Sequence, residues 1–243
     1  MGIDTPFLER ILAIGRQEGV FPGGSVLILG DCRFFASWAT GDNAADRQEF
    51  KERYKLARVE TIDVFGNPSI RMDLHESPPD SLRNQFDMVL DAGTLFCCFD
   101  VATVLRNCFD MMKDSAVIIH QAGLTGYFGR CYFNFHPALF RDFYEQNDFV
   151  VTNMEVRVFK ETCLAAKIQR IWKTWLSRPV GDYKAIDRGS HVSYADFVDM
   201  KFVERTDKTA SMLPIDALIL CAARRRMRRE FLRPLPSYYN DRS

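Results

Sequence analysis

The sequence predicts an α/β fold: a doubly wound sheet that is mostly parallel, with an antiparallel edge strand and an inserted helical cap. Three observations lead to this expectation. Short apolar runs alternate with helical segments through residues 1–160. The clearest run, Ser25–Gly30 ("SVLILG"), is continuous and ends at a glycine, which is typical of a buried parallel strand. Two late strand-like segments enclose a long stretch with no strand pattern, where a cap is expected.

Four helices are expected in the first part of the chain, over residues 4–18, 43–57, 100–114 and 137–149. The first and third have apolar residues at helical spacing: Phe7, Ile11, Leu12 and Ile14, and then Val101, Val104, Leu105, Cys108 and Met112. The second is a charged segment, "NAADRQEFKERYKLA". The fourth opens at Pro137, because proline suits the first position of a helix.

The strands alternate with these helices. After Ser25–Gly30, the segment "RVETIDVFG" alternates in polarity and stops at a Gly-Asn-Pro turn. A short third strand is expected within "SIRMDLHESPP" and a fourth within "QFDMVLDAGTLFCCF". The fifth is "SAVIIHQAG", the sixth "VVTNMEVRVFK" and the seventh "DALILCAARRR". The last two are the pair expected to form the antiparallel edge.

The pattern divides the chain into three parts. Residues 1–160 are expected to form the core domain, and residues 215–243 the final strand and a basic tail. Residues 161–214, with one helical segment at 161–176, are too long for an ordinary loop. We therefore expect a cap or an interaction insertion there, through which the protein could form a homo-oligomer.

Composition excludes several classes. Lysine and arginine balance aspartate and glutamate at 32 each, so no overall attraction to nucleic acid or to a membrane is expected. The seven cysteines show no paired spacing, which argues against a zinc site or disulfides and for a reducing, cytoplasmic location. The charged N-terminal segment does not resemble a signal peptide, and no apolar run is long enough to span a membrane.

Candidate site residues follow the strands, since ligands of open α/β sheets bind at the carboxyl ends of the strands. These positions hold acids and glycine turns: Gly30 and Asp31, Asp63, Asp73, Asp91 with Gly93, and His120 with Gly123. We expect them to meet at one edge of the sheet.

The residue types at this edge favour a nucleoside-bearing cofactor with little phosphate. A G-x-G-x-x-G turn, which a dinucleotide needs, is absent, and Asp31 would repel phosphate. Asp63 is suited to accept hydrogen bonds from ribose hydroxyls, and Asp73 from the exocyclic amine of adenine. An adenosine that carries a sulfonium fits these acids, whereas NAD fits poorly.

At this point residues 22–160 resemble the class I S-adenosylmethionine-dependent methyltransferases, which have a Rossmann-like fold. The stretch from "FDMVLDAGTLF" to "YEQNDF" carries the resemblance. It is similar to a subgroup found with glycan and natural-product biosynthesis genes, whose "Y-x-F-x-P" helix start is matched by "YFNFHP" (Tyr132–Pro137). Its "N-G-F" helix end is matched by "NDF" (Asn147–Phe149).

The resemblance implies a role for each cofactor-site residue. Gly30 and Asp31 match the turn beside the methionine part of S-adenosylmethionine, Asp63 the ribose acid, and Asp73 the adenine-side residue. Asp91 and Gly93 match the turn that floors the pocket. The chain also departs from the pattern. Its first glycine motif is reduced to "LILGDCRFF", and Phe96 and Cys97 replace the Glu and His of the subgroup.

His120 is the candidate catalytic base, because a neutral imidazole can take a proton from a hydroxyl or amine. The alternative is a histidine hydrogen-bonded within the loop. Tyr127, Tyr132 and His136 are the candidate substrate-binding residues, from a loop whose aromatic rings either form a wall for the substrate or pack beneath the cap. His136 could equally cap the helix that starts at Pro137.

Two further features of the sequence are a possible metal-ligand cluster and a run of arginines. Asp73, His75 and Glu76 could ligate a metal, but adjacent residues of an extended chain face different ways, so we expect no metal. Five arginines within residues 224–229 could contact phosphate, but a solvated strand end is more common, so nucleic acid is an improbable partner.

The resulting hypothesis is an enzyme that uses S-adenosylmethionine to methylate an O or N atom of a small molecule, preferably a sugar or glycan-like metabolite. Two alternatives stay open. A methyltransferase-like domain without transfer activity could act as a binding partner, as the reduced first motif and the missing Glu-His pair suggest. The arginine run leaves an RNA-directed methyltransferase as the third reading.

Overall fold

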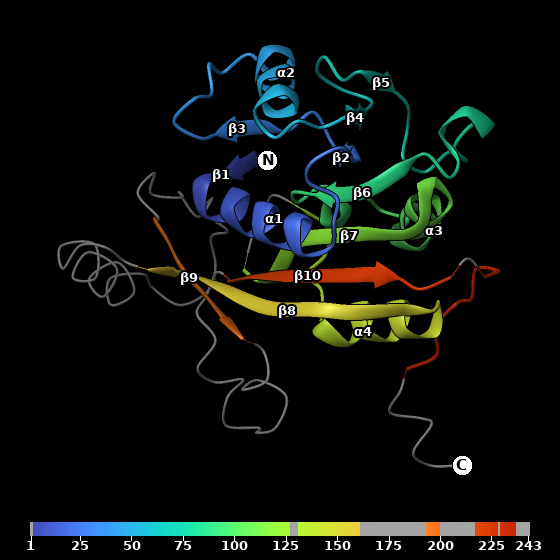
Figure 1. The fold of residues 1–243 in the computed structure, drawn as a ribbon. Coiled ribbons are helices and arrows are strands. Elements are labelled where there is room, and N and C mark those ends of the chain that lie inside the picture. The colour runs from blue at the N-terminus through green and yellow to red at the C-terminus, as the bar shows by residue number, and fades with distance from the viewer. Residues whose placement is uncertain (1, 127–130, 161–192, 200–216, 228, 237–243) are drawn as a thin grey trace, which may run out of the picture.

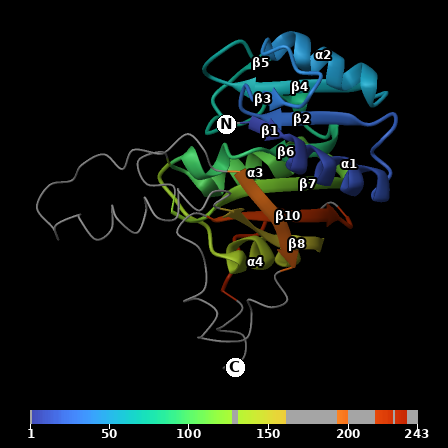
Figure 2. The same ribbon diagram turned by 90° about the vertical axis from the view of Figure 1, so that its left-hand side faces the viewer.

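The structure is a computed structural model that describes residues 2–126, 131–160, 193–199, 217–227 and 229–236. It contains an eight-stranded sheet with the order β5-β4-β2-β6-β7-β10-β8-β9 and a separate two-stranded sheet, β1-β3. Figures 1 and 2 show the strands of the large sheet stacked from β4 at one end to β8 near the other.

The parallel half of the sheet comes from the first half of the chain. Its strands are β5 (Ile70–Arg71), β4 (Arg58–Asp63), β2 (Ser25–Leu29), β6 (Phe86–Asp91) and β7 (Met112–Thr125). All four neighbouring pairs among these strands are parallel. The mostly parallel, doubly wound sheet predicted from the sequence is confirmed.

The other half is antiparallel. β10 (Ala217–Arg225) pairs with β7 on one side and with β8 (Phe149–Lys160) on the other, and β9 (Ser193–Asp199) pairs with β8. The antiparallel arrangement was expected, but the last strand lies inside the sheet and β9 is the edge. β10 suits an interior position because nearly all of its side chains are buried. Apart from β9, the cap expected over residues 161–214 lies outside the described residues.

Helices cover both faces of the sheet (Figure 1). They are α1 (Thr5–Gln17), α2 (Asn43–Arg53), α3 (Val101–Met111) and α4 (Pro137–Gln146), with short 3-10 turns η1 (Asp80–Leu82) and η2 (Leu95–Cys97). Side chains alternate along β2, so Val26 and Ile28 pack with α1 and α2, while Leu27 and Leu29 pack with α3 and α4. The core therefore consists of two apolar layers, one on each face.

Helix starts follow local sequence. Asp4 caps α1 by accepting a hydrogen bond from the Phe7 amide, and Asp42 caps α2 through the amides of Ala44 and Ala45. His136 caps α4 immediately before Pro137. The expected helices are thus present, with ends shortened by a few residues.

The N-terminal residues add a feature that the sequence did not indicate. β1 (Gly2–Asp4) pairs in parallel with β3 (Arg33–Phe35) beside the turn that follows β2. The buried guanidinium of Arg157 on β8 holds this segment, with its nitrogens 3.0 and 2.7 Å from the two carboxylate oxygens of Asp4. The start of the chain is therefore anchored to the antiparallel half of the sheet.

Candidate active site

The direction of winding reverses at β2. Strand β4 lies on one side of β2 and β6 on the other, and in such sheets the crevice for a ligand opens at the carboxyl ends of these strands. Register brings the candidate residues together, because Leu29 pairs with both Ile62 and Asp91, and Asp91 pairs with His120. The predicted convergence of strand ends is therefore present.

Gly30 makes the turn at the end of β2. Its φ is +85°, a left-handed conformation that favours glycine. A Cβ atom at this position would lie 2.5 Å from Oγ1 of Thr94. The Gly30 amide donates to the carbonyl of Ile62 at 2.8 Å, which holds the turn against β4. Glycine is needed here for both backbone conformation and space.

Asp31 and Asp63 face one another across the ends of β2 and β4. The Asp31 amide donates to Oδ2 of Asp63 at 2.8 Å, and the Phe65 amide donates to Oδ1 of Asp63 at 3.0 Å. The Asn67 amide donates to Oδ2 of Asp31 at 2.9 Å. Oδ1 of Asp31 is buried and has no hydrogen-bond partner among the described residues. Because a carboxylate offers about four acceptor positions, both acids keep capacity for a ligand.

Asp73 lies just beyond β5 and is held by His75. Its Oδ1 accepts from the His75 amide at 2.9 Å and lies 2.7 Å from the imidazole Nδ1. These two hydrogen bonds lower the pKa of Asp73. The other ring nitrogen of His75 accepts from the Asp100 amide at 3.3 Å, which joins this loop to the start of α3. The Asp73 side chain is 47% exposed, so it can still contact a ligand.

No group of three or more possible metal ligands occurs within the part of the chain that the structure describes. His75 uses both ring nitrogens for Asp73 and Asp100.

Asp91 is an acid at the end of the buried strand β6. It is fully buried, and its Oδ1 accepts from the amides of Gly93, Thr94 and Leu95 at 3.1, 2.7 and 3.1 Å. Its Oδ2 lies 2.8 Å from Nδ1 of His120. Asp91 therefore fixes the turn after β6, and its place in the floor of a cofactor pocket stays a prediction.

His120 is also fully buried. Besides its contact with Asp91, its Nε2 lies 2.5 Å from the hydroxyl of Tyr144 on α4. Both ring nitrogens are thus bonded within the protein, to side chains of β6 and α4 rather than within the loop. Its role as a catalytic base stays a prediction. Sequence reasoning missed Tyr144, whose helical position gives no sign of a polar partner across the core.

The aromatic loop presents rings beside this edge. Tyr132 is 69% exposed and Phe99 is 74% exposed, with ring centroids 5.8 Å apart, and Phe133 lies 6.3 Å from Tyr132. We call Phe99, Tyr132 and Phe133 the aromatic shelf. Amides of Tyr132 and Phe133 both donate to the carbonyl of Phe96, which places the loop next to η2. Phe99 was not among the predicted site residues.

The other two predicted substrate residues differ in outcome. Tyr127 lies outside the described residues. His136 is exposed, and its Nδ1 accepts from the Ala138 amide at 3.2 Å, so it caps α4. Nearby, burial and the charge of Asp91 raise the pKa of the Cys98 thiol to about 12, so this thiol stays protonated at neutral pH.

Much of the arginine run is engaged within the protein. Arg225 is fully buried and donates to the carbonyls of Phe109 and Met112. Arg224 pairs with Glu18 at 3.6 Å and Arg229 with Asp148 at 3.4 Å. This arrangement disfavours the run as a phosphate-binding surface.

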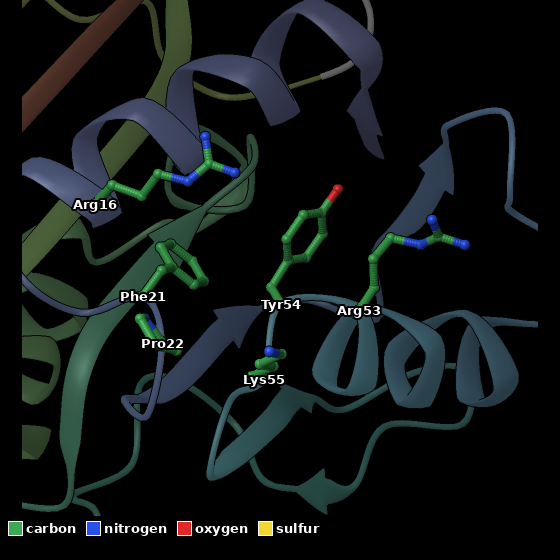
Figure 3. Close-up of a pocket in the computed structure, with 6 residues that line it drawn as sticks. All are labelled: Arg16, Phe21, Pro22, Arg53, Tyr54 and Lys55. Atoms are coloured by element: carbon green, nitrogen blue, oxygen red, sulfur yellow. The ribbon is translucent and has the colours of Figure 1, made fainter.

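A cavity of about 210 Å³ lies elsewhere, lined by Arg16, Phe21, Pro22, Arg53, Tyr54 and Lys55 (Figure 3). Phe21 and Pro22 precede β2, and Tyr54 and Lys55 precede β4, so the cavity is at the amino edge of the sheet. That is the opposite edge from the candidate site. Arg16 and Arg53 are in the last turns of α1 and α2, where a positive charge complements the helix dipole.

Among the described residues, no helix has the length and apolar character that a bilayer-spanning segment requires.

No protein-family model and no curated protein sequence matches this chain. Solved structures do match. A putative sarcosine dimethylglycine methyltransferase from Galdieria sulphuraria aligns with a TM-score of 0.51 and 10% identity, over 90% of this chain and 84% of that chain. An S-adenosylmethionine-dependent methyltransferase from Archaeoglobus fulgidus aligns with a TM-score of 0.47 and 12% identity, over 89% of this chain and 94% of that chain.

A third structure is the 1,6-didemethyltoxoflavin-N1-methyltransferase of Burkholderia thailandensis, with a TM-score of 0.45 and 12% identity over 88% of this chain and 75% of that chain. At such low identity, structural likeness establishes the fold and leaves function to be argued from the site. The chain therefore has a Rossmann-like fold, which it shares with the Galdieria methyltransferase structure at a TM-score of 0.51.

Proposed function

We propose that the protein transfers a methyl group from S-adenosylmethionine to a small-molecule acceptor. One observation carries this proposal. Asp31 and Asp63 lie at the carboxyl ends of adjacent parallel strands, around the left-handed turn of Gly30. A buried oxygen of Asp31 has no hydrogen-bond partner among the described residues. This is an acceptor-rich site at the switch point of the sheet, where an uncharged nucleoside with a cationic group fits.

The residues present fit this cofactor. Asp63 and Asp31 have unused acceptor positions for ribose hydroxyls and, being anionic, suit a positively charged sulfonium. The Phe65 ring, 78% exposed and two residues after Asp63, offers an apolar face for the planar base. Asp73 would accept from the adenine amine. Gly30 and the Asp91–Gly93 turn would enclose the methionine part, as the resemblance implies.

When bound, S-adenosylmethionine supplies an electrophilic methyl group on a positively charged sulfur. The chain's own residues would bind the cofactor and orient it toward the acceptor. Holding the acceptor atom in line with the methyl is expected to provide most of the rate enhancement. Proton removal is secondary, and its assignment to His120 rests on the prediction alone.

The acceptor is proposed to bind through its O or N atom beside the aromatic shelf. Three exposed rings on one side of the site suit a ligand with a flat apolar face, and the sugar or glycan-like metabolite expected from the sequence has such a face. His75 joins the carboxylate of Asp73 to the backbone amide of Asp100, and the half-exposed Asp73 carboxylate could accept hydrogen bonds from hydroxyl or amine groups.

A second candidate function is partner binding without methyl transfer. It is favoured by the hydrogen bonds that join the two loops flanking the site, from the Asp31 amide to Asp63 and from the Asn67 amide to Asp31. Because these hydrogen bonds hold the loops together, a cofactor would have to fit between them or on top of them. The RNA-directed alternative loses support, because Arg224, Arg225 and Arg229 all have partners within the protein.

The test is calorimetric titration of the intact protein with S-adenosylmethionine and S-adenosylhomocysteine. We expect micromolar binding that weakens at least about tenfold in Asp63→Ala, as loss of a hydrogen-bonded charged group predicts. Asp87→Ala is the matched control, because Asp87 is also half-buried and accepts a backbone amide, but at the amino end of β6. The control should bind like the wild type.

Absence of binding for both ligands in the wild type would refute the enzyme hypothesis and favour partner binding. If the ligands bind, tritium transfer from labelled S-adenosylmethionine to a panel of small acceptors, compared with RNA, identifies the acceptor class.

A further inference from the structure

A buried chain of hydrogen bonds connects α4 to the turn after β6. It runs from the hydroxyl of Tyr144 to Nε2 of His120, at 2.5 Å, and from Nδ1 of His120 to Oδ2 of Asp91, at 2.8 Å. All three residues are at most 1% exposed. Three side chains from α4, β7 and β6 thus meet in a place where polar groups are costly unless each has its partner.

The protons in this chain can be assigned from its partners. Burial raises the pKa of Tyr144 well above its ordinary value, so the hydroxyl keeps its proton and donates to Nε2. Nδ1 then carries the imidazole proton and donates to Asp91. Asp91 accepts this bond on Oδ2 and three backbone amides on Oδ1, so both of its oxygens have partners. Each of the three side chains therefore has its partner.

The turn held by Asp91 reaches the candidate cofactor site. Oγ1 of Thr94 donates to the carbonyl of Leu29 at 2.7 Å, immediately before Gly30. The same Oγ1 occupies the space that a side chain on residue 30 would need. The position of the Gly30 turn therefore depends on Thr94, and that of Thr94 depends on Asp91.

We infer that Tyr144 and His120 are positioning residues, which hold Asp91 and the Gly93–Leu95 turn in the geometry that binds the methyl donor. This inference rests on the proposed function. Through Tyr144, α4 would support the site as well as cover one face of the sheet. α4 also follows the aromatic shelf directly, and Phe135 next to the shelf packs edge-to-face on Phe140 at 5.6 Å. The helix that carries Tyr144 therefore also contacts the loop that carries the aromatic shelf.

The test uses two variants that touch the same imidazole. Tyr144→Phe removes one hydroxyl and leaves Nε2 of His120 without its donor. Phe140→Leu alters a ring whose centroid is 5.0 Å from that of His120 but makes no hydrogen bond to it. Each full-length variant is titrated with S-adenosylhomocysteine, and its thermal unfolding is recorded.

We expect Tyr144→Phe to weaken S-adenosylhomocysteine binding about fivefold to tenfold, the lower range for leaving a buried polar group unpaired. Phe140→Leu should lower the unfolding temperature but change the dissociation constant less than about twofold, since only packing is lost. Equal losses of affinity in the two variants would show a merely structural role and overturn the inference.

A second readout does not require ligand. In nitrogen-15 NMR spectra the wild type should show His120 protonated at Nδ1 alone, and Tyr144→Phe should shift the amide signals of Gly93, Thr94 and Leu95. Phe140→Leu should leave those three signals in place. Unchanged turn amides in Tyr144→Phe would overturn the inference. If the wild type binds no S-adenosylhomocysteine, the proposed function fails, while these spectra still decide whether the hydrogen-bonded chain positions the turn.

Discussion

The side chain of Thr94 joins two strands that are far apart in sequence, since its Oγ1 donates to the carbonyl of Leu29 at 2.7 Å across a separation of 65 residues. The bond closes the switch point between β6 and β2. The same hydroxyl lies where a side chain on residue 30 would be, so it also restricts that position to glycine.

Replacing Thr94 by valine keeps the shape of the side chain and removes this donor. We expect the free energy of unfolding to fall by about 1 kcal/mol, the usual net contribution of one hydrogen bond. Urea denaturation measures this loss. Thr152→Val is the control, because its hydroxyl donates to Ala222 over a longer 3.3 Å and lies far from the site. S-adenosylhomocysteine affinity should fall in the first variant and not in the second.

Gly30→Ala should be more damaging. The new methyl group meets the Thr94 hydroxyl and the backbone is forced to keep φ near +85°. We expect a loss of about 2–4 kcal/mol in the free energy of unfolding, from strain and overpacking together. Gly41→Ala separates the two causes, since Gly41 has φ +91° but a Cβ atom added there would meet no atom within 4 Å. An equal loss in both variants would mean that contact with Thr94 is unimportant.

Asp4→Ala tests the anchor of the N-terminal segment. The change removes the carboxylate that pairs with the buried Arg157, and with it the cap of α1. We expect a loss of about 2–4 kcal/mol, near the cost of breaking a buried ion pair. Asp4→Asn can still cap the helix but carries no charge, so it isolates the pairing. If Asp4→Asn is as stable as the wild type in urea, the ion pair does not stabilise the fold.

The acid end of the stability profile should depend on Asp46. Burial alone would raise the pKa of this carboxyl, but hydrogen bonds from the Thr40 amide and hydroxyl and the Gly41 amide outweigh burial and lower it. A folded-state pKa below the unfolded value means that the stabilisation is present above about pH 4 and is lost as pH falls through the folded pKa. Asp46→Asn should therefore flatten the fall in the free energy of unfolding below about pH 4. Asp114→Asn, at an exposed residue, should leave that slope unchanged.

The aromatic shelf makes a prediction about the acceptor. Once tritium transfer identifies an acceptor, Phe99→Ala should raise its KM about threefold to tenfold, since an exposed ring contributes on the order of 1 kcal/mol through stacking. S-adenosylhomocysteine affinity should stay the same. Phe35→Ala is the control, because Phe35 is also exposed but belongs to β3. A KM that does not respond to Phe99 would place the acceptor elsewhere.

Much of the fold could be predicted because it depends on local signals. The run Ser25–Leu29 is apolar at every position after the first and stops at glycine, and it forms the central strand β2. Pro137 opens α4, and Asp63 ends β4 at the site edge, as expected. Periodicity and turn chemistry act over a few residues, so they are visible in the sequence.

The placement of the last strand could not be predicted in the same way. β10 is apolar enough for any buried strand, and only pairing with β7 and β8 puts it inside the sheet. Strand order depends on which strands pair side by side around a common core, and this pairing is a property of the whole chain. β1 and β3, of three residues each, escaped prediction because such short strands depend on their partners, and β9 escaped because its segment was interpreted as part of the cap.

The candidate site also has a part that local sequence predicts and a part that depends on contacts between elements. The sequence by itself determined which acids and glycines end the parallel strands, since a strand end is a local feature. Only the tertiary structure decided that His120 is enclosed between Asp91 and Tyr144, that Asp31 bonds the loop after β4, and that Phe99 meets Tyr132. These contacts join residues from different elements, and packing selects them because a buried polar group is stable only beside its partner.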